Sequence, residues 1–459
     1  IRSEIIGIKA ENVSVGLTIH CDTVSKSGMT AGPAFPGVVN FSETILKKYI
    51  LQLAVTILLL GGMVICFNWI VDPFDVYRVV RKKGFNAYKV SYEHFARLAK
   101  VIQVEKYPKP GLALGSSRAQ LGIDMSHPLW DGRGGWNLAV NGANMYELRR
   151  LLEHAAAVSR LEKVVIGVDF YMFNIYAFKG FGDESHFFAD QNGHRNPWHR
   201  IRQNVLALCT GSAFFAGIKT LRKQDPMDNN FSQDGRMLTD RERMKVIQDG
   251  GFNKKFTKIE REFASGGWTP CANRAFCYGA PSCLNMLDEF RKTIDLAVRE
   301  KIKLYVVISP IHARLLETLY GVGLGGEFEQ WKRDMTRIVD QANSRSGDAP
   351  VELWDFSGCS VYSTEAVPTD SERNKLMRWY VDPSHYSVEL GNIMLDRLLG
   401  KESRSVFGNR LSASSIEAVL EEQRSAREEF RHRNPVLINL IKNNIFQYGQ
   451  KREKRCEGN

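Results

Sequence analysis

The sequence predicts an α/β protein: a parallel β-sheet with helices on both faces, a three-layer α/β/α sandwich, preceded by one N-terminal transmembrane helix. Five short apolar runs end in Gly, Ser, Asn or Asp, and helical segments follow or intervene. Continuous apolar strands that alternate with helices are typical of a parallel sheet buried on both faces. One uncharged segment near the N-terminus is long enough to cross a bilayer. Hydrophobic residues make up 44% of the chain, which is enough for a large core.

Residues 1–48 show no sustained periodicity and contain the Gly/Pro-rich stretch GMTAGPAFPG, so we expect them to be disordered. Residues 49–71, YILQLAVTILLLGGMVICFNWIV, carry no charge. As a helix they would measure about 34 Å, and the hydrocarbon core of a bilayer is about 30 Å thick. The segment is therefore predicted to be a single membrane anchor, with Trp69 at the interface. A buried core helix and a cleaved signal peptide are the alternatives.

The charges and the cysteines give opposite indications about the side of the membrane on which the main domain lies. The lysines and arginines are more numerous after the span than before it, which by itself favours a cytoplasmic domain. Cys271, Cys277 and Cys283 cluster in the loop-like segment PCANRAFCYGAPSC, a pattern typical of disulfides in an oxidising compartment. A metal site is the alternative, although the C-x5-C-x5-C spacing lacks the usual C-x2-C. Because long domains translocate largely regardless of charge, we expect a single-pass protein of the inner (plasma) membrane with a periplasmic or extracellular main domain.

The formal net charge of +11 favours anionic partners, such as acidic glycans, lipid headgroups or nucleic acid. The chain has no motif of a nucleic-acid-binding module, and its basic residues are scattered. Together with a membrane span, this pattern favours an anionic surface as the partner, and no nucleic acid.

The expected elements follow in order along the chain. A polar and aromatic connector occupies 72–110 and includes a helix at 91–106. The expected strands are 111–115, 136–140, 163–170, 303–309 and 351–356. The expected helices of the sheet domain are 144–160, 285–300, 326–345 and 386–399. The segment at about 175–284 breaks this rhythm and is predicted to be an insertion over one end of the sheet, with a helical stretch at 240–263. The sheet domain therefore covers 111–400, and a charged tail with one helix at 413–431 covers 401–459.

Ligands of such a sheet bind beyond the carboxyl ends of its strands, so the polar residues there form the candidate site. In chain order they are Ser116, Ser117, Gly142, Asp169, His312, Arg314, Asp382 and His385. A serine, a histidine and a carboxylate among them suit acyl transfer. A serine hydroxyl is a poor nucleophile until a base takes its proton, and an imidazole does this near neutral pH. Asp382 and His385 are three residues apart on a turn before a helix, a spacing that can place the carboxylate behind the imidazole to fix its tautomer.

The blocks Gly115-Ser116-Ser117 and Asp382-Pro383-Ser384-His385 resemble those of the SGNH hydrolase superfamily, which has a flavodoxin-like sheet. With its anchor, the chain is similar to the membrane-anchored branch that includes alginate O-acetylation proteins and the D-alanyl-lipoteichoic acid transfer protein. The resemblance covers about residues 110–400. It implies Ser117 as the nucleophile, His385 and Asp382 as its catalytic partners, and Gly142 as a donor to the oxyanion hole.

One block departs from the pattern of this superfamily. The third block is Gly-x-Asn-Asp, and here Gly167 is followed by Asp169 in the place of the asparagine. An ionised carboxylate would repel a developing oxyanion, so this position lacks its side-chain donor. Asn174 is near enough in sequence to take that role.

The resemblance implies a membrane-anchored serine acyltransferase or esterase of the cell envelope, which O-acetylates a polysaccharide through the Ser-His-Asp site. A partner of the membrane-bound O-acyltransferase type would deliver the acyl group. A carbohydrate esterase or lipase that hydrolyses is one alternative. A non-catalytic assembly subunit with the SGNH fold is another, which the departure at Asp169 favours. We expect no cofactor and no metal in the site.

Each motif also has a structural interpretation. Ser116 and Ser117 suit the N-cap of a helix, and Ser384 would suit the cap of the next helix after a turn at Pro383. His312 and Arg314 are of types that usually lie at the surface, with substrate contact at a strand end as the alternative.

Overall fold

The computed structural model of the protein describes residues 39–175, 187–188, 196, 198–267, 285–345, 351–401 and 407–457. The chain divides into two compact units, Ile1–Leu60 and Gly61–Asn459. In the first unit the described residues belong to helix α1 alone, and the second unit holds the end of α1 and all other elements. The cluster of Cys271, Cys277 and Cys283 lies outside the described residues.

The described residues of the second unit contain a six-stranded sheet of order β2-β1-β3-β4-β5-β6. The strands are β1 (Gly111–Leu114), β2 (Gly135–Asn137), β3 (Lys163–Val168), β4 (Lys303–Ile308), β5 (Glu352–Asp355) and β6 (Asn409–Leu411). The first five are parallel, and β6 pairs antiparallel with β5. The predicted α/β class and mostly parallel sheet are thus confirmed, whereas β2 ends earlier than predicted and β6 was not expected.

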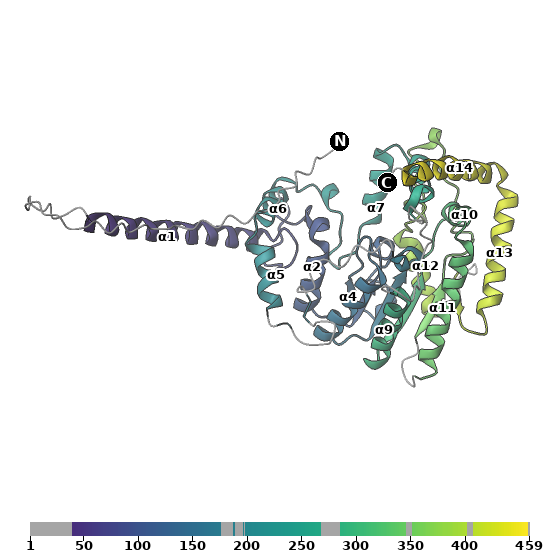
Figure 1. The fold of residues 1–459 in the computed structure, drawn as a ribbon, viewed down its shortest axis with the longest axis horizontal. Helices are drawn as coiled ribbons and strands as arrows, with labels where there is room; N and C mark the ends of the chain where they lie inside the picture. The colour runs from purple at the N-terminus through teal and green to yellow at the C-terminus, as the bar shows by residue number, and fades with distance from the viewer. Residues whose placement is uncertain are drawn as a thin grey trace, which may run out of the picture. The chain divides into compact units, whose positions relative to one another are not determined.

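Figure 1 draws the helices of the described residues together with this sheet. Those before the insertion are α1 (Val39–Val71), α2 (Tyr92–Lys106), α3 (Ser117–Gly122) and α4 (Met145–Val158). The predicted insertion contributes α5 (His199–Leu208), α6 (Gly211–Arg222), α7 (Thr239–Gln248) and α8 (Phe252–Glu262). The rest are α9 (Met286–Arg299), α10 (Ala313–Gly321), α11 (Gly325–Asn343), α12 (Val388–Leu398), α13 (Ile416–Arg433) and α14 (Pro435–Glu457).

The core lies on both faces of the sheet because side chains alternate along each strand. In β3, Val164 and Ile166 belong to one buried cluster, which includes residues of α4, α9 and α11. Val165 belongs to a second cluster with residues of α3 and α12, among them Ala119 and Leu390. Each strand between helical layers is therefore apolar on both sides, which explains the continuous apolar runs in the sequence.

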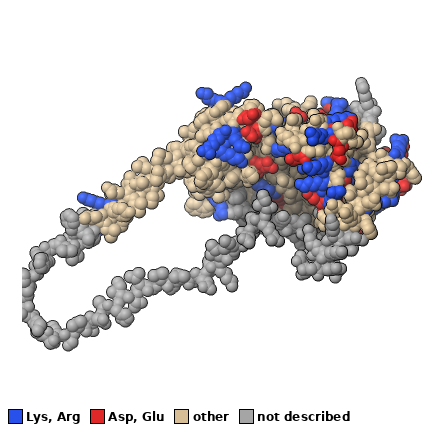
Figure 2. Space-filling view, turned by 90° about the horizontal axis from the view of Figure 1, so that it is seen from above, with Lys and Arg blue, Asp and Glu red and all other residues tan. Residues whose placement is uncertain are grey.

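Helix α1 contains the predicted membrane anchor. Its segment Ile45–Val71 is long enough and apolar enough to cross a membrane, and the most apolar 18-residue window is exposed rather than packed in a core. Figure 2 shows it as a tan stretch, because residues 49–71 include no Lys, Arg, Asp or Glu. One exposed apolar helix near the N-terminus is confirmed, and such a helix is either a membrane span or a signal.

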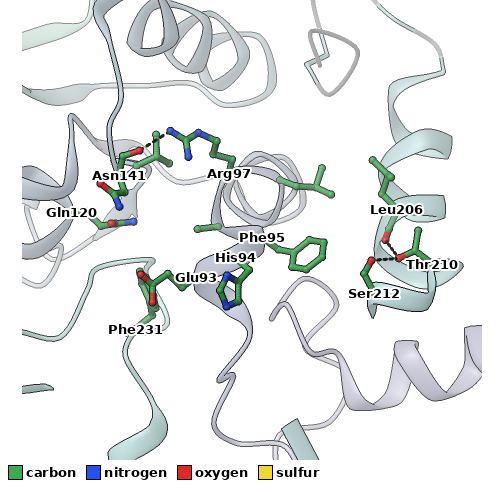
Figure 3. Close-up of a pocket in the computed structure, with 13 residues that line it drawn as sticks. Glu93, His94, Phe95, Arg97, Gln120, Asn141, Leu206, Thr210, Ser212 and Phe231 are labelled. Carbon is green, nitrogen blue, oxygen red and sulfur yellow. Dashed lines mark hydrogen bonds between the residues drawn. The ribbon is translucent and has the colours of Figure 1, made fainter. Parts of the chain in front are cut away.

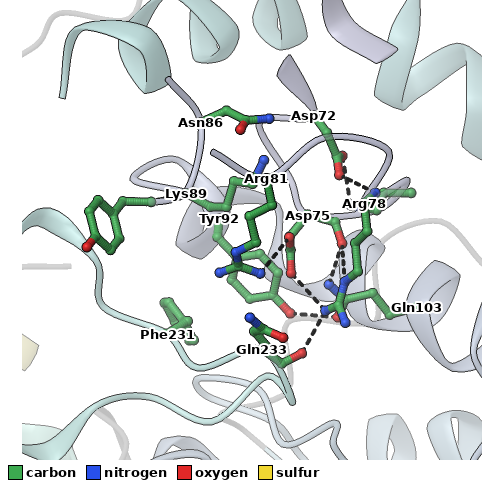
Figure 4. A network of polar contacts seen from close by, with 12 residues as sticks. Asp72, Asp75, Arg78, Arg81, Asn86, Lys89, Tyr92, Gln103, Phe231 and Gln233 are labelled. Atoms are coloured by element: carbon green, nitrogen blue, oxygen red, sulfur yellow. Dashed lines mark hydrogen bonds and ion pairs between the residues drawn. The ribbon is translucent and has the colours of Figure 1, made fainter. Parts of the chain in front are cut away.

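The connector after α1 is tightly folded rather than extended. The carboxylate of Asp72 accepts the backbone N–H groups of Val76, Tyr77 and Arg78 at 2.8–3.0 Å. Asp72 and Arg78 adopt positive φ angles of 48° and 53°. Residues other than glycine rarely adopt such angles, so the surrounding contacts hold this bend in place. Figure 4 shows these groups converging on one polar network.

The last carbonyl groups of α1 are capped by side chains from this network. Asn86 donates to the carbonyls of Ile70 and Val71 at 3.2 and 3.1 Å, and Lys89 donates to Val71 at 2.9 Å. A helix end has unsatisfied carbonyls and a negative partial charge, so an amide and an ammonium group both stabilise it. Burial lowers the pKa of Lys89. The end of α1 is therefore fixed to the folded domain by buried groups.

Candidate active site

The turn between β1 and α3 assigns different roles to the two adjacent serines. Ser116 is the N-cap of α3, and its hydroxyl accepts the N–H of Arg118 at 3.2 Å. The same hydroxyl donates to Asp169 at 2.5 Å. Ser117 is the first residue of α3, and its side chain is only partly buried. The interpretation of the two serines as helix-cap residues therefore holds for Ser116, whereas Ser117 is not the cap of α3.

Two glycines allow this turn to lie close to β3. Gly115 has a φ of 147°, and a Cβ there would lie 2.5 Å from the Cβ of Ala119. A Cβ on Gly167 would lie 2.9 Å from the same atom. Only residues without a side chain fit at both positions, so the start of α3 is pressed against the end of β3.

His385 lies at the tip of a short hairpin that precedes α12. An isolated antiparallel bridge joins Tyr380 to Tyr386, and the N–H of Val381 donates to the carbonyl of His385 at 2.9 Å. Ser387, rather than Ser384 as expected, is the N-cap of α12 and accepts the N–H of Leu390. The hairpin presents Asp382 and His385 on one side of a rigid turn.

Ser117, His385 and Asp382 form a continuous row of hydrogen bonds. The Ser117 Oγ lies 2.8 Å from His385 Nε2, and His385 Nδ1 lies 2.9 Å from both carboxylate oxygens of Asp382. The His385 side chain is 27% exposed and that of Asp382 is 6% exposed. The end of the row at His385 is therefore partly exposed, whereas the carboxylate is enclosed.

The surroundings of Asp382 favour its ionised form. Burial alone would raise the pKa of this carboxyl, but His385, followed by Lys255, holds the pKa below its ordinary value. The N–H groups of Ser384 and His385 also donate to Oδ1 at 2.8 and 2.9 Å. An ionised Asp382 keeps the proton of the imidazole on Nδ1, so that Nε2 is free to accept the proton of the serine.

The two halves of the row are brought together by a close contact between α3 and α12. A Cβ on Gly391 would lie 1.8 Å from the carbonyl oxygen of Gly122. A Cβ on Gly122 would lie 1.9 Å from the ring of Tyr386. Ser117 is on α3 and His385 comes just before α12, so this backbone contact sets the distance between them.

Arg118 ties the site together and was missed by the sequence analysis. Its Nη1 pairs with Asp169 at 2.9 Å, and its Nε donates to the hydroxyl of Ser384 at 3.1 Å. The side chains of Arg118 and Asp169 are 3% and 0% exposed. Burial alone would lower the pKa of Arg118, but Asp169 raises it. Asp169 is thus a structural anchor, and the sequence signal for it was the charged residue directly after Gly-Ser-Ser.

Two other predicted site residues, Gly142 and Asn174, are not members of this row. Gly142 is exposed in the turn after β2, with a φ of 67° that favours glycine. Asn174 is buried at the end of the 3-10 turn Phe170–Phe173, and the hydrogen bonds of the row do not include it.

His312 and Arg314 are buried, whereas residues of these types usually lie at the surface. His312 caps α10, and its Nε2 lies 2.8 Å from the carbonyl of Glu365. Its backbone N–H donates to the carbonyl of Pro383, which supports the turn that carries Asp382. Arg314 forms two hydrogen bonds with Glu260 of α8, at 2.6 and 2.9 Å. The sequence could not show this burial, because the partner of Arg314 comes from the insertion.

A cavity of about 320 Å³ has Gln120 and Asn141 among its lining residues (Figure 3). Its walls come from α2, from the adjoining helices α5 and α6, and from two segments of the site region, one on α3 and one after β2. Gln120 is one turn after Ser117 on α3, and Asn141 precedes Gly142. The lining of the cavity is mostly apolar, with Phe95 and Leu206 among its residues.

Among the described residues, no group of three or more His, Cys, Asp or Glu side chains is arranged to hold a metal ion. No protein-family model matches the chain, and no curated protein matches it.

The contact between α3 and α12 predicts the effect of one added methyl group. Gly391→Ala should lower the free energy of unfolding by about 1–3 kcal/mol, because overpacking forces the helices apart. Gly326→Ala is the control, since this exposed glycine of α11 has nothing within 4 Å and an alanine there should be neutral or stabilising. Chemical unfolding in mild detergent measures both, and equal stability of the two variants would contradict the contact.

The Arg118–Asp169 pair predicts that the asparagine typical of the superfamily is harmful here. Asp169→Asn keeps the size of the side chain but leaves a buried guanidinium without its counter-ion, which should cost about 3–5 kcal/mol of stability. Asp240→Asn removes an 88% exposed partner of Arg243 and should cost less than about 1 kcal/mol. If the two substitutions cost the same in urea unfolding, the anchor role is wrong.

Buried histidines predict a loss of stability in mild acid. Burial lowers the pKa of His312 to about 3, whereas an unfolded histidine titrates near about 6.5. Between these values the unfolded chain binds a proton that the folded chain does not. Stability should therefore fall as the pH drops through this window, by up to about 1.4 kcal/mol per pH unit for this group.

His312→Asn still suits a helix cap. Because it removes one titrating group, the free energy of unfolding should depend less on pH than in the unsubstituted protein, by the contribution of one proton. The exposed His94→Asn should keep the original slope. The measurement is urea unfolding at a series of pH values, and parallel profiles for all three proteins would show that His312 does not contribute.

Proposed function

We propose that the protein is a membrane-anchored serine acyltransferase or esterase of the cell envelope. The single observation that carries this proposal is the row from Ser117 through His385 to Asp382, with Oγ 2.8 Å from Nε2. A nucleophile, a base within hydrogen-bond reach and a buried carboxylate that orients the base are the parts that acyl transfer from serine requires.

The proposed reaction uses these three groups in two steps. Ser117 Oγ attacks the acyl carbonyl carbon while His385 Nε2 takes the hydroxyl proton, and the tetrahedral intermediate collapses as the bond to the leaving group breaks. His385 gives the proton to the leaving group, and the acyl group stays on Ser117 as an ester. A carbohydrate hydroxyl or water then attacks that ester, with His385 again taking and returning a proton.

The proposal includes membership of the SGNH superfamily in its membrane-anchored branch. The support is the matching order of Gly-Ser-Ser after β1 and Asp-Pro-Ser-His before α12. The proposal accommodates the departure at Asp169, because backbone N–H groups can bind the oxyanion in place of a side-chain amide. The first N–H groups of a helix have no intrahelical partner, and Ser117 is the first residue of α3. With Gly142, these donors replace the missing amide.

The anchor supports a place at the envelope. A helix that crosses the membrane next to the domain keeps the site at the bilayer surface, where a polysaccharide acceptor such as an acidic glycan suits the net charge of +11. We propose that the domain lies outside the cytoplasm, and that a membrane-bound O-acyltransferase hands it the acyl group, with acetyl as the transferred group.

Hydrolysis by the same site is the second candidate function. The observation that favours it is the 27% exposure of His385, which lets water reach the acyl-enzyme. A non-catalytic assembly subunit would not need the hydrogen bond between Ser117 and His385. The presence of this hydrogen bond therefore argues against that alternative.

The proposed chemistry predicts graded losses of activity. Ser117→Ala and His385→Ala should each lower turnover of a chromogenic acetyl ester by roughly 10⁴-fold or more, because nucleophile and base act as a unit. Asp382→Asn should be roughly 10-fold less severe, since it only misorients the base. Mass spectrometry should detect an acyl adduct on Ser117 of the unsubstituted protein.

Ser414→Ala, which removes an exposed hydroxyl, is the matched control and should keep full turnover. The acylation of envelope polysaccharide in a strain with Ser117→Ala decides between enzyme and assembly subunit. Unchanged acylation in that strain, together with a folded protein that forms no adduct, would overturn the proposed function.

A further inference from the structure

The α5–α6 hairpin, His199–Arg222, exposes large apolar side chains where a surface helix normally carries polar ones. Trp198, Ile201 and Val205 are 70%, 55% and 47% exposed, and Phe215 of α6 is 70% exposed. The first three are spaced three and four residues apart, so they form one stripe along α5. We call these four side chains the hairpin face. Contiguous exposed apolar surface of this kind marks a contact with a partner or a membrane.

Both helices bury their opposite sides against the domain. His199, Gln203 and Ala207 are the buried residues of α5, and Ala213 and Ala216 are among those of α6. Basic side chains flank the apolar stripe: Arg200 and Arg202 on α5, and Lys219, Arg222 and Lys223 on and after α6. An apolar stripe bordered by Lys and Arg is the pattern of a helix that lies in a membrane interface.

The hairpin is attached to the end of α1, as Figure 1 also shows. The rings of Phe67 and Phe214 lie 5.1 Å apart, and a Cβ on Gly217 would lie 2.5 Å from Phe67. The side chain of Asn68 is buried and donates to the carbonyl of Leu208 at 2.7 Å. These contacts fix the hairpin at the level where the apolar segment of α1 ends.

The apolar surface of α1 continues up to these contacts. Ile65, Trp69 and Ile70 are 38%, 44% and 40% exposed, so the surface of the last turns of α1 remains apolar. If the last turn of α1 lies at the boundary of the hydrocarbon core, the parts of α5 and α6 that contact Phe67 and Asn68 lie at the level of the lipid headgroups. Capping of α1 by Asn86 and Lys89 keeps this arrangement fixed.

We propose that the α5–α6 hairpin is a second membrane contact, which lies in the interface of the bilayer that α1 crosses and inserts the hairpin face among the lipid headgroups and upper acyl chains. The proposal rests on α1 being a membrane span and is independent of the acyl-transfer chemistry. The occupant of this surface is the lipid bilayer.

The hairpin does not span the bilayer. Its two helices are bent by 50° at a short break. By length and composition alone the two helices could form one bent span, but each has a row of residues buried in the domain, which a lipid-surrounded span would not have. Their buried sides pack against protein, so only one side of each is available to lipid. Contact in the plane of the interface therefore fits these helices, and a crossing does not.

Photo-crosslinking of the full chain in vesicles tests this proposal. The photoreactive amino acid p-benzoylphenylalanine replaces Phe215 in one variant and Ile201 in another, and each protein is reconstituted in phosphatidylcholine vesicles with a minority of phosphatidylglycerol. After irradiation, mass spectrometry measures the fraction of protein that carries a covalent phospholipid. A thermal midpoint equal to that of the unsubstituted protein verifies that each variant is folded.

Two further positions calibrate the experiment. Leu58, which is 74% exposed on α1, is the positive control, and Val361, which is 67% exposed after β5, is the matched control on the domain. Lipid adducts at Phe215 and Ile201 should reach the level at Leu58 and exceed that at Val361 by about tenfold. Adducts at the Val361 level would overturn the proposal. Predominant crosslinks to a second copy or to another polypeptide would overturn it as well, because they would identify the face as a protein interface.

Discussion

The buried ion pair between Arg118 and Asp169 is the constraint on which the candidate site depends. Arg118 directly follows Ser117, and its guanidinium reaches both Asp169 after β3 and Ser384 in the turn that carries His385. Neither charge is accessible to water, so each would be strongly destabilising without the other. The pair therefore holds three segments in one arrangement, and the serine and histidine meet as a consequence of that arrangement.

Close backbone contacts act together with the ion pair to hold the segments of the site in place. Parallel pairing of β1 and β3 places their carboxyl ends at one edge, and Gly115 and Gly167 let the start of α3 lie against β3. Gly122 and Gly391 then bring α12 against α3. Ser117 and His385, which are 268 positions apart in the chain, are thereby held within a hydrogen bond. Close packing without side chains leaves little freedom for the row to open, which is the preorganisation that catalysis requires.

The sequence allowed the central features to be predicted because their signals are local. Apolar runs that end in polar residues identified β1, β3, β4 and β5, and the order of Gly-Ser-Ser and Asp-Pro-Ser-His located Ser117, Asp382 and His385. Strand β6 has three residues, of which only the last is buried, so it has no run to detect. The burial of Arg118, His312 and Arg314 depends on partners 51 to 54 positions away, and a charged or imidazole side chain carries no local sign that such a partner exists.

On the proposal that α1 crosses the membrane, the contacts at its end determine how it holds the domain. A flexible linker after α1 would let the domain drift, but Asn86 and Lys89 bind the last carbonyls of the helix, and Asp72 folds the following residues into a closed turn. On the proposal of a second membrane contact, the hairpin removes the remaining freedom of the domain to rotate about α1. The cavity lined by Gln120 and Asn141 also has Leu206 of α5 in its wall, so the proposed membrane contact adjoins this cavity. A substrate held at the membrane surface would then reach Ser117 by diffusion in two dimensions, and the anchor would set the height at which the two meet.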